Sequence, residues 1–417
     1  QANSDRTWAP IMRGLDREYV RDRMNACIDW PDGTRVAAVK VRRFLPGRRQ
    51  RFDIEYELLV QRQVGGREHL QRGTLFARRA NNNIAAATDP PIVTDGGISR
   101  VLAADEDLGF VLYSADCDPN LSQYGRCVNG DWMIERLTEL GLIPRQPLNG
   151  SSGGPLRLHC ERVAFRLGRR FVVRYALSGG PNEMQWAGKC YADDRGERLA
   201  DLHRQLYEQL MSITGGRVRL PRLIHYDDDL KMVLTVWNSS GSYSAEPQPS
   251  VLAQRAAESL VAIQAASPSG LSEVDPLDRW QTLERWNTCV QQLLPELAPR
   301  CKELMGALSV AYSELPDPDQ VVIHRDFYES QLLTDRDGAI VLDLDTLAIG
   351  DRSTDVGNYL AHQWLWCLER GLSFDRYQTM AETFLETYER GARPLNDRTV
   401  VRMGVVTVSG RCDSCVS

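Results

Sequence analysis

The stretch that decides the fold is residues 322–333, which read VIHRDFYESQLL. Residues 339–345 follow as AIVLDLD, and residues 350–355 as GDRSTD. Two short apolar runs separated by a turn predict a pair of strands, each ending in polar residues. Any one of the acidic residues alone would indicate an exposed polar turn. Their combination at this spacing is typical of a site that handles phosphate and a divalent cation.

Phosphoryl transfer needs a carboxylate that orients the attacking hydroxyl, oxygen ligands for Mg²⁺ and a cation for the nucleotide phosphates. The pattern H-R-D-x-x-x-x-N, followed by an Asp at the end of a strand, supplies the carboxylate and the metal ligands. Asp326 stands at the Asp of this pattern, Gln331 at its Asn, and Asp343 at the metal-binding Asp. A Gln amide oxygen can bind Mg²⁺, but its longer arm changes the ligand geometry.

From residue 322 to residue 355 the chain resembles the aminoglycoside phosphotransferase and choline kinase-like branch of the protein-kinase fold. That branch has H-G-D-x-x-x-x-N, then an I-D-W-E-type segment, then G-D-P-x-x-D. The resemblance implies a two-lobed α+β fold with a β-rich nucleotide-binding lobe and a mainly helical lobe. It also implies ATP and Mg²⁺ as cofactors, a small-molecule hydroxyl substrate, and supporting roles for His324, Asp351 and Asp355.

The cation for the phosphates is expected on the run 184–191, MQWAGKCY, which reads as a strand carrying Lys189. The run precedes a predicted helix, as in the nucleotide lobe of kinases, where a strand Lys pairs with a helix Glu. Glu208 is the preferred partner because it lies in the middle of that helix, and Glu197 is the alternative.

The chain has no G-x-G-x-x-G loop, and the family that it resembles positions the nucleotide with a hairpin instead. Gly179-Gly180 are the candidates for the tip of that hairpin, on the weak evidence of an ordinary Gly-Gly-Pro turn. The resemblance places the adenine edge against backbone groups of the connector between the lobes, at Val236 and Trp237.

Two pairs of segments indicate an internal repeat in the first part of the chain. Residues 43–58 and 165–177 both join an Arg-rich turn to an alternating run, and residues 105–112 and 227–234 share the pattern of acidic residues followed by an apolar run. The same order in both copies predicts two similar β-rich units.

The two copies differ between their third and fourth expected strands. The second copy has residues 195–212, whose leucines recur at helical spacing. The first copy has residues 79–90, with Asn-Asn-Asn and little helical pattern, and it carries Arg78-Arg79 where the second has Lys189. Arg does not simply replace Lys at such a site. The first copy is therefore expected to be a degenerate unit without catalytic residues that does not bind ATP.

The expected organisation has five parts. They are a tail at 1–15, an N-lobe-like repeat at 16–130, a linker at 131–152, the nucleotide-binding lobe at 153–240 and the helical lobe with the catalytic loop at 241–417.

Composition narrows the partners. The 417 residues have a formal net charge of −6 and a pI near 5.7, so nothing favours binding to nucleic acid. No apolar run reaches the length of a membrane span, and the ten cysteines are scattered, which favours a cytoplasmic protein without membrane contact. Only the pair 412 and 415 has metal or redox spacing. The oligomeric state is not indicated.

The sequence therefore predicts an ATP-dependent small-molecule kinase that transfers the γ-phosphoryl group to a hydroxyl of a sugar, aminocyclitol or amino alcohol. The alternative is a weakly active or inactive nucleotide-binding pseudokinase with a regulatory or scaffold role, for which Gln331 and the degenerate repeat argue. A kinase acting on a protein is disfavoured because no recognisable activation loop or A-P-E element follows Asp343.

Overall fold

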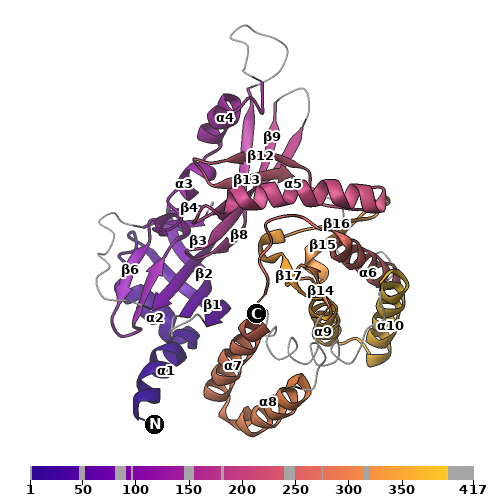
Figure 1. The fold of residues 1–417 in the computed structure, drawn as a ribbon. Coiled ribbons are helices and arrows are strands. Elements are labelled where there is room, and N and C mark those ends of the chain that lie inside the picture. Colours follow the sequence, from indigo (N-terminus) through magenta and orange to yellow (C-terminus); the bar gives the residue numbers. More distant parts are fainter. Residues whose placement is uncertain are drawn as a thin grey trace.

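The chain forms two antiparallel β-sheets and a mainly helical lobe (Figure 1). The computed structural model describes residues 2–46, 52–79, 91–94, 97–144, 155–179, 183–238, 249–274, 276–313 and 319–392.

The first sheet has the strand order β1-β2-β3-β7-β6. Two helices precede it, and a small hairpin lies between its third and fourth strands. These elements are α1 (Ala2–Leu15), α2 (Arg17–Cys27), β1 (Thr34–Pro46), β2 (Phe52–Val64), β3 (Arg67–Arg79), β4 (Ile92–Thr94), β5 (Gly97–Ser99), β6 (Leu102–Asp105) and β7 (Phe110–Tyr113).

The second sheet has the order β8-β9-β10-β13-β12. Two helices precede it as well, and a long helix covers it after the third strand. These elements are α3 (Tyr124–Cys127), α4 (Gly130–Glu139), β8 (Arg157–Arg166), β9 (Arg170–Ser178), β10 (Met184–Tyr191), α5 (Arg195–Thr214), β12 (Leu223–Asp227) and β13 (Met232–Val236).

The two sheets have the same topology, which confirms the predicted repeat. In chain order, the first strand of each sheet pairs with the second, the second with the third, the third with the last, and the last with the fourth. The register also corresponds, because Arg78 pairs with Val111 in the first sheet and Lys189 pairs with Val233 in the second. Arg78 is thus the positional counterpart of Lys189.

Two buried tyrosines at equivalent places anchor each sheet to the segment before it. Tyr56 donates a hydrogen bond to the carbonyl of Gly14 at 2.7 Å, and Tyr175 donates to the carbonyl of Cys127 at 2.9 Å. Both side chains are fully buried. Because a buried hydroxyl needs a partner, these bonds fix the helices that supply the carbonyls.

Two buried aspartates repeat in the same way. Asp105 accepts a hydrogen bond at 2.8 Å from Arg23 on α2, and Asp227 accepts one at 2.8 Å from Arg136 on α4. Each carboxylate also caps the turn that follows its strand. The repeated unit therefore consists of helices followed by a five-stranded sheet.

This arrangement corrects the expected boundaries at both units. Residues 2–15 are not a tail, since they form α1, and Ile11 lies in the core of the first sheet. Residues 131–139 of the expected linker belong to α4, whose Met133 and Leu137 lie in the core of the second sheet. Sequence patterns showed the strands of each unit but not the short helices that precede them.

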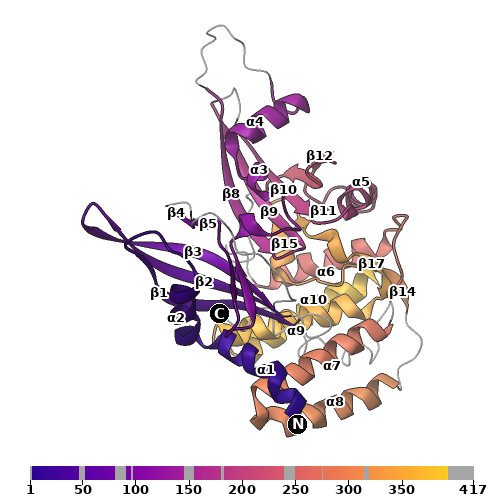
Figure 2. The same cartoon turned by 90° about the vertical axis from the view of Figure 1, so that its left-hand side faces the viewer.

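The helical lobe carries the catalytic segment on short strands between helices. Its elements are α6 (Pro249–Ala265), α7 (Pro276–Leu293), α8 (Ala298–Ser313), β14 (Gln320–Ile323), β15 (Leu332–Thr334), β16 (Ala339–Val341), β17 (Ala348–Asp351), α9 (Ser353–Glu369) and α10 (Phe374–Gly391). The short strand β11 (Val218–Arg219) joins β16 in this lobe. Helix α5 shares its buried leucines with the core of this lobe, so the second sheet and the helical lobe pack around a common helix (Figure 2).

Within the described residues, no helix is both long and apolar enough to cross a membrane.

Candidate active site

The catalytic loop follows β14 and is held by a buried carboxylate. Asp355, at the start of α9, accepts hydrogen bonds from the backbone N–H of His324 at 2.6 Å and of Arg325 at 2.7 Å. The fully buried His324 ring lies 2.8 Å from the carbonyl of Leu342, and its own carbonyl accepts from Thr346 at 2.7 Å. These bonds tie the loop to the strand that leads to Asp343 and give Asp326 a fixed backbone.

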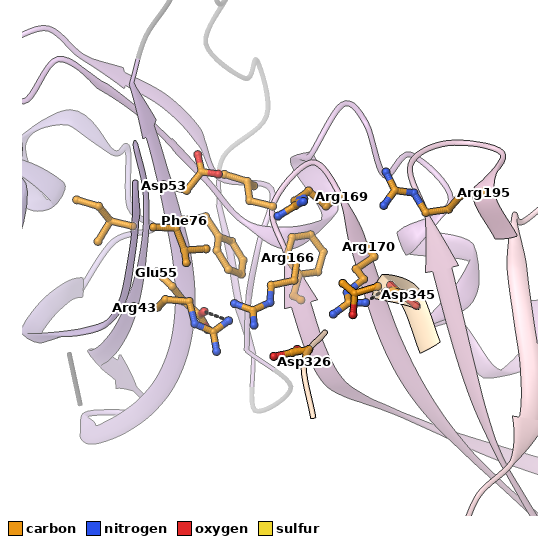
Figure 3. A pocket seen from close by; sticks show the side chains of 15 residues that line it. Arg43, Asp53, Glu55, Phe76, Arg166, Arg169, Arg170, Arg195, Asp326 and Asp345 are labelled. Carbon is orange, nitrogen blue, oxygen red and sulfur yellow. Dashed lines mark hydrogen bonds and ion pairs between the residues drawn. The ribbon is translucent and has the colours of Figure 1, made fainter. Parts of the chain in front are cut away.

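Asp326 opens onto a cavity of about 330 Å³. The same cavity is lined by Asp345 and Thr346 from the helical lobe and by Arg170 from the second sheet (Figure 3). Asp326 is half-buried. Its carboxylate is therefore accessible to a molecule in the cavity while its backbone stays fixed.

Four charged side chains converge beside this cavity. Lys189 lies 2.7 Å from Asp343 and 2.6 Å from Asp345. Arg170 spans both oxygens of Asp343, at 3.1 and 3.0 Å, and also contacts Asp345. Burial alone would raise the pKa of Asp343, but the charges and hydrogen bonds of Lys189 and Arg170 lower it well below its ordinary value. Asp343 is therefore a carboxylate throughout the neutral and mildly acidic range.

Tyr191 completes this cluster. Its hydroxyl donates to Asp345 at 2.8 Å. Burial, and then the charge of Asp345, raise the pKa of Tyr191 well above its ordinary value. The phenol therefore stays protonated and orients Asp345 toward Lys189.

Gln331 is the last residue of a short 3-10 turn, directly before β15. Its carbonyl accepts from the N–H of Leu342 at 2.9 Å, which places it beside the residue before Asp343. Burial and the charge of Asp326 raise the pKa of Tyr328 to about 12. The Gln331 side chain acts to lower the pKa of the Tyr328 phenol.

The expected pairing of Lys189 with Glu208 is wrong. Glu208 is exposed on α5, two residues from both Leu206 and Leu210, which are buried. At about 100° per residue, this spacing turns Glu208 away from the sheet. The alternative, Glu197, is exposed too. The partners of Lys189 are Asp343 and Asp345 instead.

The buried polar residue of α5 is His203. Its ring lies 2.7 Å from the carbonyl of Pro221. Burial lowers the pKa of His203, and the charge of Lys189 contributes to the lowering. A neutral His, and neither Glu208 nor Glu197, is thus the polar residue that α5 buries.

Gly179 does not line the cavity onto which Asp326 opens. It is exposed just beyond the end of β9, nine residues from Arg170, which corresponds to about 30 Å along an extended strand. Gly180 lies outside the described residues. The turn that faces the cleft is the β8–β9 turn at 167–169, in which Gly168 has φ 64°. The prediction from the Gly-Gly-Pro sequence was therefore wrong, because this sequence follows the C-terminal end of β9 and the turn at the cavity precedes β9.

Residues of the first unit hold the β8–β9 turn. Arg78 makes two hydrogen bonds to Asp53, at 2.8 and 3.0 Å, and donates to the carbonyl of Leu167 at 2.9 Å. Asp118 accepts a hydrogen bond from the N–H of Gly168. A Cβ at Gly168 would lie 2.8 Å from the Arg78 guanidinium, so glycine also leaves room for this contact.

Val236 ends β13, and Trp237 follows it at the start of the connector to the helical lobe. The N–H of Val236 donates to Arg222 and that of Trp237 to Gln185, at 2.9 and 3.0 Å. The guanidinium of Arg174 lies 5.1 Å from the centre of the Trp237 ring. Both N–H groups expected at an adenine edge are therefore already used within the protein.

Asp351 lies away from the cluster. It is buried at the end of β17 and accepts hydrogen bonds from the backbone and hydroxyl of Ser353, at 3.0 and 2.8 Å. It thus fixes the start of α9, the helix that carries Asp355.

Sequence reasoning missed Arg170 and Tyr191. The Arg-rich turn before β9 was visible as a mark of the repeat, but nothing local connected it with Asp343, 173 residues later. Within the described residues, no group of three or more His, Cys, Asp or Glu side chains forms a metal site by itself. The pair 412 and 415 lies outside these residues.

The sequence of the chain matches a model of a known protein family. The model of the phosphotransferase enzyme family (APH) matches residues 167–399, a span that contains Lys189, Asp326 and Asp343. A search of curated proteins found no match.

Solved structures show weaker similarity. The macrolide 2'-phosphotransferase of Brachybacterium faecium is 18% identical, with a TM-score of 0.44, covering 66% of this chain and 88% of its own. Spectinomycin phosphotransferase is 10% identical, with a TM-score of 0.47, covering 68% and 87%. The choline kinase of Streptococcus pneumoniae is 13% identical, with a TM-score of 0.41, covering 68% and 90%. On the family match, which spans more than half of its length, the chain belongs to the phosphotransferase enzyme family.

Proposed function

We propose that the protein is an ATP- and Mg²⁺-dependent kinase that phosphorylates a hydroxyl of a small molecule, such as a sugar, aminocyclitol or amino alcohol. Family membership supports phosphoryl transfer. The observation that carries the proposal is the convergence of Lys189 and Asp343, 2.7 Å apart, beside the cavity onto which Asp326 opens.

Asp326 is the residue that orients the acceptor. Its carboxylate accepts the hydroxyl proton as the acceptor oxygen forms a bond to the γ-phosphorus. The bond between that phosphorus and the bridging oxygen breaks at the same time, and ADP leaves with the electron pair. Asp355 holds the backbone next to Asp326, so the carboxylate needs little rearrangement before the reaction.

The oxygen donors beside Lys189 suit Mg²⁺, which prefers carboxylates and accepts neutral amide oxygens. Asp343 and Gln331 would hold the ion, which would neutralise charge on the β- and γ-phosphates. Lys189 would contact the α- and β-phosphates, and the carbonyls of the connector after β13 or the N–H of Asn238 would bind the adenine edge.

Replacing Asp326 by Asn tests this assignment. Turnover should fall by about a thousandfold, because a positioned base contributes roughly 10²–10⁴-fold, while the affinity for Mg·ATP stays the same. Asp337→Asn is the matched control, since Asp337 is an exposed side chain in the turn after β15. Retained turnover in Asp326→Asn, measured as ADP release with a panel of sugars and amino alcohols, would rule out the assignment.

One observation favours the pseudokinase alternative. Both oxygens of Asp343 already accept hydrogen bonds from Arg170, and one of them also accepts from Lys189. A metal ion at Asp343 would therefore have to share the carboxylate with Arg170 and Lys189, whose three hydrogen bonds leave one acceptor direction open on the second oxygen. A thermal shift with Mg·ATP in the absence of any phosphoryl transfer would support this alternative, and transfer to any alcohol would exclude it.

A further inference from the structure

We propose that the cavity between the first sheet and the catalytic loop is the acceptor site, and that the acceptor is a monosaccharide-sized alcohol carrying an anionic group, either a carboxylate or a phosphate ester. This inference rests on the proposed kinase function. It gives the first unit a role as one wall of the acceptor site.

The cavity lies between the two units and the helical lobe (Figure 3). Strands β1, β2 and β3 of the first sheet form one wall, and the β8–β9 turn forms the other. Asp326, Asp345 and Thr346 line it from the helical lobe. Its volume of about 330 Å³ lies at the small end of ligand pockets, which fits a monosaccharide and not an oligosaccharide antibiotic. An alcohol held here has its hydroxyl within reach of Asp326.

Arginine is the most frequent residue in the lining. The five arginines are Arg43, Arg166, Arg169, Arg170 and Arg195. The lining also has carboxylates. Asp53 is paired with Arg78, Glu55 with Arg43, and Asp345 with Lys189 and Arg170.

Arg43 on the wall formed by the first sheet and Arg169 in the β8–β9 turn are the two guanidinium groups that could donate hydrogen bonds to a ligand. The Nε of Arg43 is buried and has no hydrogen-bond partner among the described residues. Its ion pair with Glu55 is long, at 3.9 Å. Arg169 is exposed in the β8–β9 turn and lines the cavity. Guanidinium groups bind carboxylates and phosphates with paired donors, so these positions suit an anionic group of the acceptor.

The walls are fixed relative to each other before any ligand binds. Arg78 connects Asp53 of the first sheet to the carbonyl of Leu167, and Asp118 holds the N–H of Gly168. The rings of Phe76 and Phe165, one from each wall, lie 4.8 Å apart. The first sheet and the turn therefore form a built cavity, in which an acceptor loses less freedom on binding than in a flexible gap.

The variants Arg43→Gln and Arg43→Lys test the site, with Arg72→Gln as the matched control. Arg72 lies in the same sheet, has a side chain that is 80% exposed, and does not line the cavity. The full chain would be assayed with Mg·ATP against gluconate and glucuronate as carboxylates, glucose 1-phosphate as a phosphate ester, glucose and inositol as neutral alcohols, and glucosamine as a cation. ATP affinity would be measured separately by calorimetry.

The inference predicts phosphorylation of at least one anionic compound. Higher activity with gluconate or glucuronate would indicate a carboxylate acceptor, and higher activity with glucose 1-phosphate would indicate a phosphate ester. Arg43→Gln should raise the KM for that compound by about ten- to a hundredfold, as expected for a lost charged hydrogen bond. Arg43→Lys should recover part of the loss, and the KM for ATP should not change. Transfer only to neutral or cationic alcohols, or equal acceptor KM values for Arg43→Gln and Arg72→Gln, would overturn the inference. Absence of ATP binding would instead overturn the kinase function on which it rests.

Discussion

The two five-stranded sheets have the same strand order and matching register, yet they use one position in opposite ways. In the second sheet, Lys189 reaches Asp343 and Asp345 of the helical lobe. In the first sheet, its counterpart Arg78 reaches Asp53 and the turn of the neighbouring sheet. One copy thus supplies a cation that pairs with two aspartates of the helical lobe, and the other supplies a cation that holds the β8–β9 turn in place.

The residues that are the same in both copies are structural. The buried tyrosines Tyr56 and Tyr175, and the buried aspartates Asp105 and Asp227, make equivalent contacts in each. Among the residues that the structure describes, α5 has no counterpart in the first copy, and this helix is the one through which the second sheet joins the helical lobe. The two copies therefore keep one architecture, while strands β1, β2 and β3 of the first copy line the cavity onto which Asp326 opens.

The largest expected difference between the copies is in activity. Lys189→Ala should lower kcat/KM by about 10²–10³-fold, the usual cost of removing a preorganised charge from such a site. Arg78→Ala should lower it by only about tenfold, mainly through the KM for the acceptor, because it loosens the β8–β9 turn that lines the cavity and leaves the reacting groups in place. Steady-state kinetics with an acceptor that the enzyme phosphorylates would measure kcat/KM for both variants. Equal losses in Lys189→Ala and Arg78→Ala would contradict the different roles of the two residues.

The buried aspartates should matter equally to both copies. Asp227→Asn and Asp105→Asn should each lower the free energy of unfolding by about 2–3 kcal/mol at pH 7, since each breaks a charged hydrogen bond to a carboxylate with at most 1% of its side chain exposed. Urea unfolding would measure both losses. A loss confined to one variant would show that the copies are not equivalent in construction.

Asp227 also allows a test against pH. Burial alone would raise its pKa, but the hydrogen bond and charge of Arg136 lower it below the ordinary value. A carboxylate with a lowered pKa in the folded state stabilises the protein above its unfolded pKa, near 4, and this contribution is lost as the pH falls through the folded pKa. The difference in the free energy of unfolding between the wild type and Asp227→Asn should therefore become smaller below about pH 4. A difference that does not change with pH would show that the ion pair with Arg136 does not stabilise the fold.

The smallest effects are expected at the tyrosines. Tyr56→Phe and Tyr175→Phe each remove one buried hydrogen bond to a backbone carbonyl and keep the ring, so each should cost about 1 kcal/mol of stability. Thermal unfolding of the two variants would measure this loss. A much larger loss for Tyr56→Phe would indicate that α1 depends on this bond for its attachment.

Much of the fold could be predicted from local sequence. The catalytic segment, the strands on either side of its turn and the repeat are encoded in short patterns that the structure preserves. The helices α1 and α4 were missed because nothing in the strand pattern indicates that a unit begins with helices. The leucines of α5 indicate which face of the helix is buried. Glu208 lies on the opposite face, so this pattern already argues against Glu208 as the partner of Lys189.

The electrostatic centre of the site could be predicted only in part. Lys189, Asp326 and Asp343 belong to recognisable motifs, and the structure brings Lys189 and Asp343 into contact. Arg170 lies in no such motif, and its contacts arise only when the second sheet packs on the helical lobe. The same holds for Arg78, whose bond to Leu167 depends on how the two sheets are placed.

The central claim is that only the second of the two sheets binds nucleotide, through Lys189. Isothermal titration calorimetry with Mg·ATP on the wild type, Lys189→Ala and Arg78→Ala tests it most directly. The account predicts one nucleotide per chain, affinity lowered at least tenfold in Lys189→Ala, and unchanged stoichiometry in Arg78→Ala. Two nucleotides per chain, or wild-type affinity in Lys189→Ala, would contradict it.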